Sequence, residues 1–361
     1  MSARAPIRVT IIAPGPQSEG GIRSVVERIY PRLEAFDDIE IHWLASQRAG
    51  SVVAKVLRFL GALGSALILL PRSDVVHVHG AVHLSLLRKS VFVWLARLVR
   101  CHVIYHFHAP QTVFEEFFAQ PGLKRRYALA TLRQCDAIVV LSDSWEQTVR
   151  AVVPDSSIVV IYNPVMDTQC AGTDNRDNSR DVLYLAHLIR RKGFDDLVRA
   201  FSKVVEKVPD ARLVFCGSGE TRYAQELSEE LGISDCVVFR GWIPEAQIVK
   251  ELSAASVFCL PSYDEGLPMG ILEAMSAGTA IVTTPVGGIP DVLSHERNAL
   301  LVEPGDVDDL SNQLVRLLTD PALRNHLSQE ALRDSARFHP DRIAVNWSDM
   351  YHQIAGAKMV T

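Results

Sequence analysis

The 361-residue sequence lacks the cysteine patterns that mark metal and disulfide frameworks. Its six cysteines are scattered, and no two of them form a C-x-x-C pair. Structural zinc sites are built on such pairs, and small secreted domains space their cysteines regularly. We therefore expect reduced thiols, no structural zinc and a cytoplasmic location.

The sequence also lacks an apolar run that is both long and uncharged. The most apolar stretch, 52–70, contains Lys55 and Arg58, and Pro71 follows directly. A membrane span needs about 20 apolar residues with few charges. We expect a packed helix with an apolar, basic face, and a similar second helix over 84–100. Together the two helices either lie on an anionic membrane surface or simply cover the sheet.

A signal peptide and an excess of positive charge are absent as well. Residues 7–13 are typical of a first strand rather than a leader. The net charge of −5 disfavours nucleic-acid binding. The charge is unevenly distributed, because residues 48–133 hold twelve basic and three acidic residues, whereas the rest of the chain holds 25 and 39. A basic N-terminal half favours an anionic partner such as a lipid headgroup, and the alternative is a solvated basic face without a partner.

Strand and helix patterns alternate in both halves of the chain and predict two α/β domains. At about 150 residues per domain, the length also gives two. We expect two doubly wound, Rossmann-like domains facing across a cleft. The predicted N-terminal domain is 1–165, the polar linker 166–180 and the C-terminal domain 181–336, and a last helix in 337–361 crosses back to the first domain.

The stretch 261–290 carries the clearest functional pattern. An expected strand, 256–260, leads into a loop with Glu265, then a helix with Glu273, a second strand and the glycine loop 287–288. Such βαβ units bind ligands at the carboxyl ends of their strands, where the following helix start favours anions. Carboxylates beside an anion site suit the hydroxyls of a ribose or a sugar. Spacing alone equally allows a loop acid and a solvated helix residue.

A run of cations follows the first expected strand of the second domain. Arg190, Arg191 and Lys192 lie just before a predicted helix. Three cations at a helix start suit a diphosphate leaving group. The alternative is an ordinary charged surface turn.

Histidines cluster near the ends of two expected strands of the first domain. By strand alternation, His77 and His79 share one face of their strand, as do His106 and His108. Such histidines could act as a base, a hydrogen-bond donor or metal ligands. No H-E-x-x-H motif or nearby cysteine pair supports a metal. We expect no metal here, and structural roles for His79 and His106.

Weaker signals lie elsewhere. Gly20 and Gly21 precede a helix and allow close approach to a phosphate, although such turns are common and no G-x-G-x-x-G is present. Gly217 lies in a turn after one strand, and Trp242 follows another, where it either lines a ligand or belongs to the core. Asp306 begins a D-x-D sequence, and we expect it to cap a helix.

The spacing of Glu265 and Glu273, with Gly-Leu-Pro after the first and E-A-M-S-A-G around the second, resembles the retaining family-4 glycosyltransferases (group 1) of the GT-B fold. The resemblance extends over nearly the whole chain. It implies an acceptor domain followed by a donor domain. It also implies metal-independent transfer of a sugar, with retention, from a UDP- or GDP-sugar to an acceptor hydroxyl.

The resemblance assigns roles residue by residue. Glu265 would bind the donor sugar, Glu273 the nucleotide ribose and His108 the transferred sugar. Lys192, with Arg190 or Arg191, would stabilise the diphosphate. The other expected donor contacts are Gly20, Gly21, Gly217, Trp242, Gly266 and Leu267. The family usually has Gly-Arg where this chain has Ala186-His187.

The expected function is therefore sugar transfer in surface polysaccharide assembly. The expected partners are a nucleotide sugar, an acceptor glycan or lipid-linked sugar, and the anionic inner face of a membrane. We expect no cofactor, no metal and no nucleic acid. One alternative, favoured by His187, is a catalytically silent partner that binds a nucleotide sugar. Another is a nucleotide-sugar epimerase or phosphorylase of similar architecture.

Overall fold

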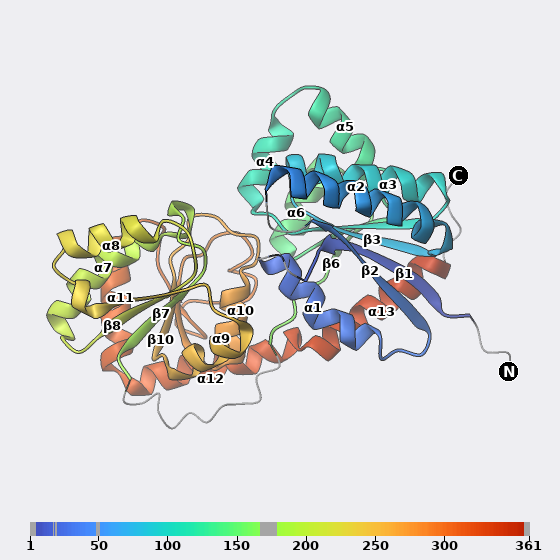
Figure 1. Ribbon diagram of the computed structural model, residues 1–361. Helices are drawn as coiled ribbons and strands as arrows, with labels where there is room; N and C mark the ends of the chain where they lie inside the picture. The colour runs from blue at the N-terminus through green and yellow to red at the C-terminus, as the bar shows by residue number, and fades with distance from the viewer. Residues whose placement is uncertain (1–4, 17, 19, 48–50, 167–178, 357–361) are drawn as a thin grey trace. The chain divides into compact units, whose positions relative to one another are not determined.

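The computed structural model describes residues 5–16, 18, 20–47, 51–166 and 179–356 (Figure 1). The chain divides into two compact units. The first comprises Met1–Pro164 with Pro340–Thr361, and the second Val165–His339. Most of the expected linker, 166–180, lies outside the described residues.

The first unit is built on a six-stranded sheet in the order β2-β1-β3-β4-β5-β6. All of its strand pairs are parallel. From β1 the chain adds β2 on one side of the sheet and β3 to β6 on the other, so the strand order reverses between β1 and β3. The elements are β1 (Ile7–Pro14), α1 (Gly21–Leu33), β2 (Ile39–Gln47), α2 (Val52–Leu69), η1 (Leu70–Arg72), β3 (Val75–Gly80), α3 (Leu84–Leu98), β4 (His102–Phe107), α4 (Gln111–Ala119), α5 (Leu123–Leu132), β5 (Ala137–Val140), α6 (Asp143–Val152), β6 (Ile158–Val160) and α13 (Pro340–Gly356).

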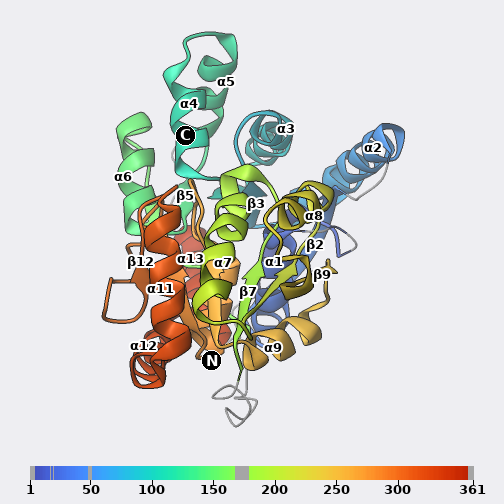
Figure 2. The ribbon, with the colours of Figure 1, turned by 90° about the vertical axis from the view of Figure 1, so that its left-hand side faces the viewer.

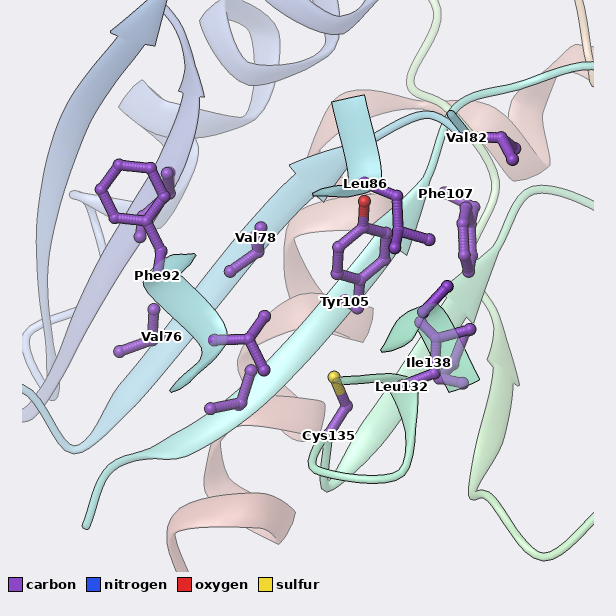
Figure 3. Packing of buried hydrophobic residues seen from close by; sticks show 14 of the residues in the cluster. Val76, Val78, Val82, Leu86, Phe92, Tyr105, Phe107, Leu132, Cys135 and Ile138 are labelled. Atoms are coloured by element: carbon purple, nitrogen blue, oxygen red, sulfur yellow. The ribbon is translucent and has the colours of Figure 1, made fainter. Parts of the chain in front are cut away.

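Helices cover both faces of this sheet. The core on one face includes residues of α2, α3 and α5, and the core on the other face includes residues of α1 and α13 (Figure 1). Figure 3 shows Val76 and Val78 of β3 and Tyr105 of β4 in the first of these cores, together with Leu86 and Phe92 of α3. Alternate residues of a buried parallel strand thus fill opposite layers, which explains the nearly continuous apolar strands.

The second unit repeats the plan with a parallel sheet in the order β12-β11-β10-β7-β8-β9. Its strand order reverses between β7 and β10. The elements are β7 (Asp181–Leu185), η3 (Arg190–Lys192), α7 (Phe194–Lys207), β8 (Arg212–Cys216), α8 (Thr221–Glu230), η4 (Ser234–Cys236), β9 (Val237–Gly241), α9 (Glu245–Ala254), β10 (Val257–Leu260), α10 (Met269–Ser276), β11 (Ala280–Thr283), β12 (Leu300–Leu301), α11 (Val307–Thr319), α12 (Pro321–Ser335) and η5 (Ala336–Phe338). The predicted fold class, two doubly wound α/β domains, is confirmed.

Two local predictions have different outcomes. Asp306 caps α11 as expected, because its side chain accepts a hydrogen bond from the Asp309 amide (2.9 Å). The helix over 84–100 was expected either to lie on a membrane or to cover the sheet, and Lys89 agrees only with the second interpretation. Lys89 is 2% exposed and donates to the Ile12 carbonyl (3.0 Å) and to Ser46 Oγ (2.5 Å). Burial also lowers its pKa well below the ordinary value.

Helix α2 packs against the sheet, as expected, through Ala62 and Ala66, which are buried in the core. In the part of the chain that the structure describes, the segment Val53–Arg72 is long and apolar enough to cross a bilayer by length and composition alone. Core helices of soluble proteins pass the same test. Only 17% of its most apolar window is buried, so most of the helix surface faces outward.

A close backbone contact in the second unit depends on a glycine. Gly193, with φ of 66°, joins η3 to α7, and a Cβ there would lie 2.0 Å from the Pro261 carbonyl oxygen. Gly232 has a similar φ of 71° but no atom within 4 Å of such a Cβ. The loop that follows β7 is therefore pressed against the loop that follows β10.

We predict that Gly193→Ala lowers the free energy of unfolding more than Gly232→Ala. The left-handed backbone alone costs an alanine about 1–2 kcal/mol, whereas the clash at position 193 adds about 1–3 kcal/mol. Urea unfolding of the two variants measures the difference. Equal losses would show that the loops can separate without cost.

Candidate functional site

Two loops of the second unit meet where its strand order reverses. In open α/β sheets, ligands bind beside the carboxyl ends of the strands at such a point. The Tyr263 amide, after β10, donates to the Arg191 carbonyl, after β7 (2.8 Å). Arg191 Nη1 donates in turn to the Asp264 carbonyl (2.7 Å). These bonds hold the two loops together at the expected ligand position.

An ion pair joins the same two loops. Lys192 Nζ donates to Glu265 Oε1, which also accepts a hydrogen bond from Ser262 Oγ (2.8 Å). Glu265 is 4% exposed, so its charge is compensated inside the protein rather than by bulk water. The structure thus brings together two of the predicted site residues, which lie far apart in sequence. Ser262, their third partner, was missed, because nothing about a serine before Glu265 marks it as a ligand.

The two neighbouring arginines have different surroundings. Arg191 is used to brace the loop, as described above. The Arg190 side chain is 62% exposed and lies over the Tyr223 ring (4.6 Å), with Asp195 at 3.4 Å. Exposed ion pairs are weak and are easily exchanged for another partner. Arg190 is therefore the better placed of the two to meet an anion from solvent.

Glycines let a third loop approach Glu265. A Cβ on Gly287, whose φ is 56°, would lie 1.9 Å from the Glu265 carbonyl oxygen. The Gly288 amide donates to the Gly266 carbonyl (2.6 Å). Leu267 is buried in the same turn. The glycine pair after β11 thus packs on the loop that holds Glu265.

Glu273 lies on α10, which begins just after this loop. It is 5% exposed, so the interpretation of Glu273 as a solvated helix residue is wrong. Glu265 does lie in a loop, but it is buried. Carboxylates are rarely buried, because burial removes their hydration, so two buried carboxylates near one helix start are unusual.

The remaining predicted residues of the second unit lie near the ends of β7, β8 and β9. A Cβ on Gly217 would lie 1.8 Å from the Ala186 carbonyl oxygen, so the turn after β8 packs on the loop after β7. Trp242 is 49% exposed and is not a core residue. His187 Nδ1 lies 3.2 Å from Ser218 Oγ. The residue that replaces the family arginine is thus held against the β8 turn.

The first unit has its own strand-order reversal, between β1 and β3. The loop after β1 contains Gly20, with φ of 118°, and a Cβ there would meet no atom within 4 Å. Gly20 precedes α1, whose first residue is Gly21, and the helix start has no side-chain cap. The open backbone and the uncapped amides are compatible with the predicted phosphate contact.

Four histidines form a connected group in the first unit. His108, just after β4, has Nε2 2.9 Å from Nδ1 of His79 on β3. The His106 ring lies 4.0 Å from that of His108 and 5.5 Å from that of His77, between ring centroids. His77 Nδ1 lies 2.9 Å from the Tyr351 hydroxyl of α13. Sequence alternation had placed the histidines in pairs, and the pairing of β3 with β4 brings the pairs together.

Burial keeps these imidazoles neutral. It lowers the pKa of His77, His79 and His106 well below the ordinary value, and that of His108 to about 3. Neighbouring cations and imidazoles add to the effect. At neutral pH His108 is therefore a hydrogen-bonding group rather than a cation or a strong base.

The surroundings favour one tautomer of His108. If His108 donated to His79, the proton of His79 would sit on Nε2, which is buried and has no partner among the described residues. A buried N–H without a partner is rarer than an unfilled acceptor. The lower-energy arrangement has His79 Nδ1 donating to His108 Nε2. His108 then carries its proton on Nδ1, which remains available as a donor.

Three of these histidines lie close enough together to be examined as metal ligands by their geometry. Within the described chain, nitrogens of His77, His79 and His106 lie within 4.8 Å of one another. A tetrahedral zinc with bonds of 2.0–2.1 Å needs ligand atoms only about 3.4 Å apart. The His77 and His79 rings are stacked, with centroids 4.2 Å apart and an angle of 29°. The rings would have to turn before they could share an ion.

We predict that His79 sets the tautomer of His108. In long-range ¹H–¹⁵N spectra, wild-type His108 should show a protonated Nδ1, and in His79→Phe the proton should move toward Nε2, because the donor is gone. The exposed His326 provides an internal reference. An unchanged His108 spectrum in the variant would contradict the assignment.

We also predict that the first unit loses stability in acid. Below about pH 6.5 the unfolded chain protonates the four histidines, whereas the folded unit excludes those protons. The free energy of unfolding should fall with pH by up to about 1.4 kcal/mol per pH unit for each histidine. The stabilisation is complete above about pH 6.5 and is lost progressively below it.

Urea unfolding between pH 7.5 and 5 measures this effect through tryptophan fluorescence. Trp145 and Trp347 are buried in the first unit and report its unfolding. The control is His106→Gln, which removes one titrating group and should flatten the slope by about one histidine's share. A stability independent of pH in this range would refute the prediction.

Two family models match the chain. The model described as "Glycosyl transferase 4-like domain" matches residues 2–164, and "Glycosyl transferases group 1" matches residues 166–334. The two matches cover nearly the whole chain and adjoin near the boundary between the units.

Curated relatives share part of the sequence. An "uncharacterized glycosyltransferase" of Methanocaldococcus jannaschii is 30% identical over 240 residues, 62% of this chain and 61% of that protein. The N-acetyl-alpha-D-glucosaminyl L-malate synthase of Bacillus anthracis is 27% identical over 297 residues, 78% of this chain and 75% of that protein. The match spans about three fifths of the length of the Methanocaldococcus protein and of a similar Haemophilus influenzae protein.

Solved structures share the fold. Sucrose-phosphate synthase from Thermosynechococcus elongatus has a TM-score of 0.78 at 21% identity, covering 98% of this chain and all of that chain. Anabaena HepE, solved with UDP and glucose, has a TM-score of 0.77 at 16% identity, covering 95% and 99%. The two doubly wound units are those of a GT-B protein. The chain belongs to the group 1 glycosyltransferases of family 4.

Proposed function

We propose that the protein is a retaining glycosyltransferase that moves a sugar from a UDP- or GDP-sugar to an acceptor hydroxyl. One observation carries this proposal: the Lys192–Glu265 pair at the strand-order reversal of the second unit, next to buried Glu273. Family membership supports the class of reaction, and the contacts of the site support the residue roles that the resemblance implies.

Charge and hydrogen bonding support the donor roles that the resemblance implies. An ammonium has three N–H donors. Lys192 donates one hydrogen bond to Glu265, so its other donors can bind the departing diphosphate. Arg190 adds a second cation from its exposed position. Stabilising the charge that develops on a leaving group is usually the largest catalytic contribution. Because these cations neutralise the phosphates, the proposed reaction needs no metal.

The carboxylates bind hydroxyls in this proposal. Glu273, close to the start of α10, would grip the ribose diol, while Glu265 would hold the donor sugar. Glu265 Oε1 already accepts two hydrogen bonds, which makes that oxygen a poor nucleophile. Retention without a covalent glycosyl-enzyme therefore fits the site better, with the leaving phosphate oxygen taking the proton of the acceptor. His108 would donate from Nδ1 to the transferred sugar.

The acceptor in this proposal is a lipid-linked sugar of surface polysaccharide assembly, reached at the cytoplasmic face of a membrane. The excess of basic residues in 48–133 supports a location beside anionic lipid. One observation favours a second candidate, a silent nucleotide-sugar-binding partner. His187 stands where the family has an arginine, so no guanidinium is available to the diphosphate at this position. The imidazole contacts Ser218 instead.

We predict that one donor among UDP-, GDP- and ADP-sugars releases nucleotide in the presence of EDTA. Glu273→Ala and Lys192→Ala should each lower this release about 100-fold or more, because each removes a contact to the charged donor. The matched control is Lys203→Ala, an exposed lysine of α7 that pairs with Asp308. NMR of the transferred product then gives the anomeric configuration.

The outcomes separate the alternatives. Release that EDTA abolishes would refute metal independence, and variants as active as wild type would refute the site. Donor binding without release, even with membrane extract as a source of acceptor, would indicate the silent partner. A rearranged sugar nucleotide formed without acceptor would indicate an epimerase.

A further inference from the structure

Helix α2 has two apolar faces, and only one of them is covered. On the covered face Ala62 and Ala66 are buried, and the Phe59 ring packs edge-on against Phe92 (5.7 Å between centroids, 84°). On the other face, six large apolar side chains are 52% to 68% exposed: Val53, Val56, Leu57, Leu60, Leu67 and Ile68. Their spacing of three, four, seven, fourteen and fifteen residues from Val53 places them on one side of a helix with 3.6 residues per turn. We call these six residues the α2 stripe.

Exposed apolar side chains also lie on α3, which contacts α2, and at the start of α5. Leu84 and Leu98 of α3 are each 79% exposed, and Leu123 at the start of α5 is 80% exposed. Figure 1 shows α2 and α3 side by side on the same face of their sheet, and both contribute to the core beneath them. In Figure 2 no other helix of the first unit covers the outer side of α2. Soluble monomers rarely leave an apolar surface of this extent to water.

The charges around the stripe have one sign. Helices α2 and α3 contain no acidic residue. Arg72 is exposed at the end of η1, and Arg100 is exposed just after α3. Lys55 and Arg58, two and five residues after Val53, are exposed on the side of α2 opposite the stripe. None of the four forms an ion pair within the described residues. A helix with exposed leucines on one face and cations on the opposite face has the chemistry of an interfacial membrane helix. Anionic headgroups would meet these cations, and the acyl boundary would receive the leucines.

We propose that the α2 stripe, together with the outer side of α3, docks on an anionic phospholipid bilayer, with α2 lying in the plane of the interface. The helix does not span, because its covered face is fixed in the core of the unit through Ala62 and Ala66. This inference names the surface and the orientation for the membrane location in the proposed function. It does not depend on sugar transfer.

Vesicle sedimentation tests the proposal with the full-length chain and no donor. Wild type should sediment with vesicles of phosphatidylcholine and phosphatidylglycerol (3:1), and much less with phosphatidylcholine alone or in 0.5 M salt. Leu57→Ser combined with Leu60→Ser should weaken partitioning about 10-fold or more, because two inserting side chains are lost. Lys55→Glu combined with Arg58→Glu should weaken the preference for the anionic vesicles, because it reverses two charges within about a Debye length of the surface.

The matched control is Val345→Ser combined with Leu332→Ser. These residues are exposed apolar side chains of α13 and α12, outside the proposed surface, at 47% and 36% exposure. The control should partition like wild type. Thermal unfolding followed by circular dichroism checks that each variant is folded, which exposed substitutions should not prevent.

Four results would overturn the proposal. Wild type could stay in the supernatant with both vesicles, or the Leu57/Leu60 variant could bind as wild type does. Wild-type protein that resists alkaline carbonate extraction from vesicles would indicate a span instead of an in-plane helix. A dimer that the Leu57/Leu60 variant converts to a monomer, without vesicle binding, would make the stripe an interface between copies. Loss of binding in the Leu57/Leu60 variant with unchanged nucleotide release would separate this inference from the proposed function.

Discussion

The ion pair between Lys192 and Glu265 is the constraint on which the second unit depends. Removing either partner would leave a poorly solvated charge without compensation, which is far more costly than losing an exposed pair. The pair also requires the loops after β7 and β10 to lie close together. That closeness explains why a glycine occupies position 193, where a Cβ would meet the Pro261 carbonyl oxygen, and Gly287 allows the loop after β11 to approach Glu265 in the same way. The backbone of the site thus follows from one electrostatic contact.

The first unit also buries titratable side chains, but without ion pairs. Its titratable site residues are buried without countercharges, so they remain neutral instead of pairing. A neutral His108 can donate a hydrogen bond to a sugar without drawing a phosphate toward itself. The loop of the second unit that contains Arg190 and Lys192 is positively charged and would attract a phosphate. In the proposed function, the neutral histidine therefore recognises the sugar, and the cations of the second unit recognise the phosphates.

Periodicity predicted the two sheets, because alternating apolar strands and amphipathic helices leave a clear local signal. The resemblance marked Glu265, Glu273 and Lys192 as site residues, but not that Lys192 bonds Glu265, since pairing across two loops depends on strand order. The sequence could not place Lys89 for a related reason: a lysine in a basic, apolar helix has the same local pattern whether it faces solvent or the core. The contact between His79 and His108 likewise required knowing that β3 lies beside β4.

Mean hydropathy does not distinguish the two apolar faces of α2. The helix is therefore long and apolar enough to cross a membrane, although one of its faces belongs to the core of the first unit. The uneven charge of the chain then decides which surface an anionic bilayer would meet. Residues outside 48–133 carry 25 basic and 39 acidic side chains, so a negative surface repels them while it attracts the segment of α2 and α3. In the proposed docking, burial of the α2 stripe would supply the apolar contribution, and the uneven charge would favour the orientation in which α2 and α3 face the bilayer.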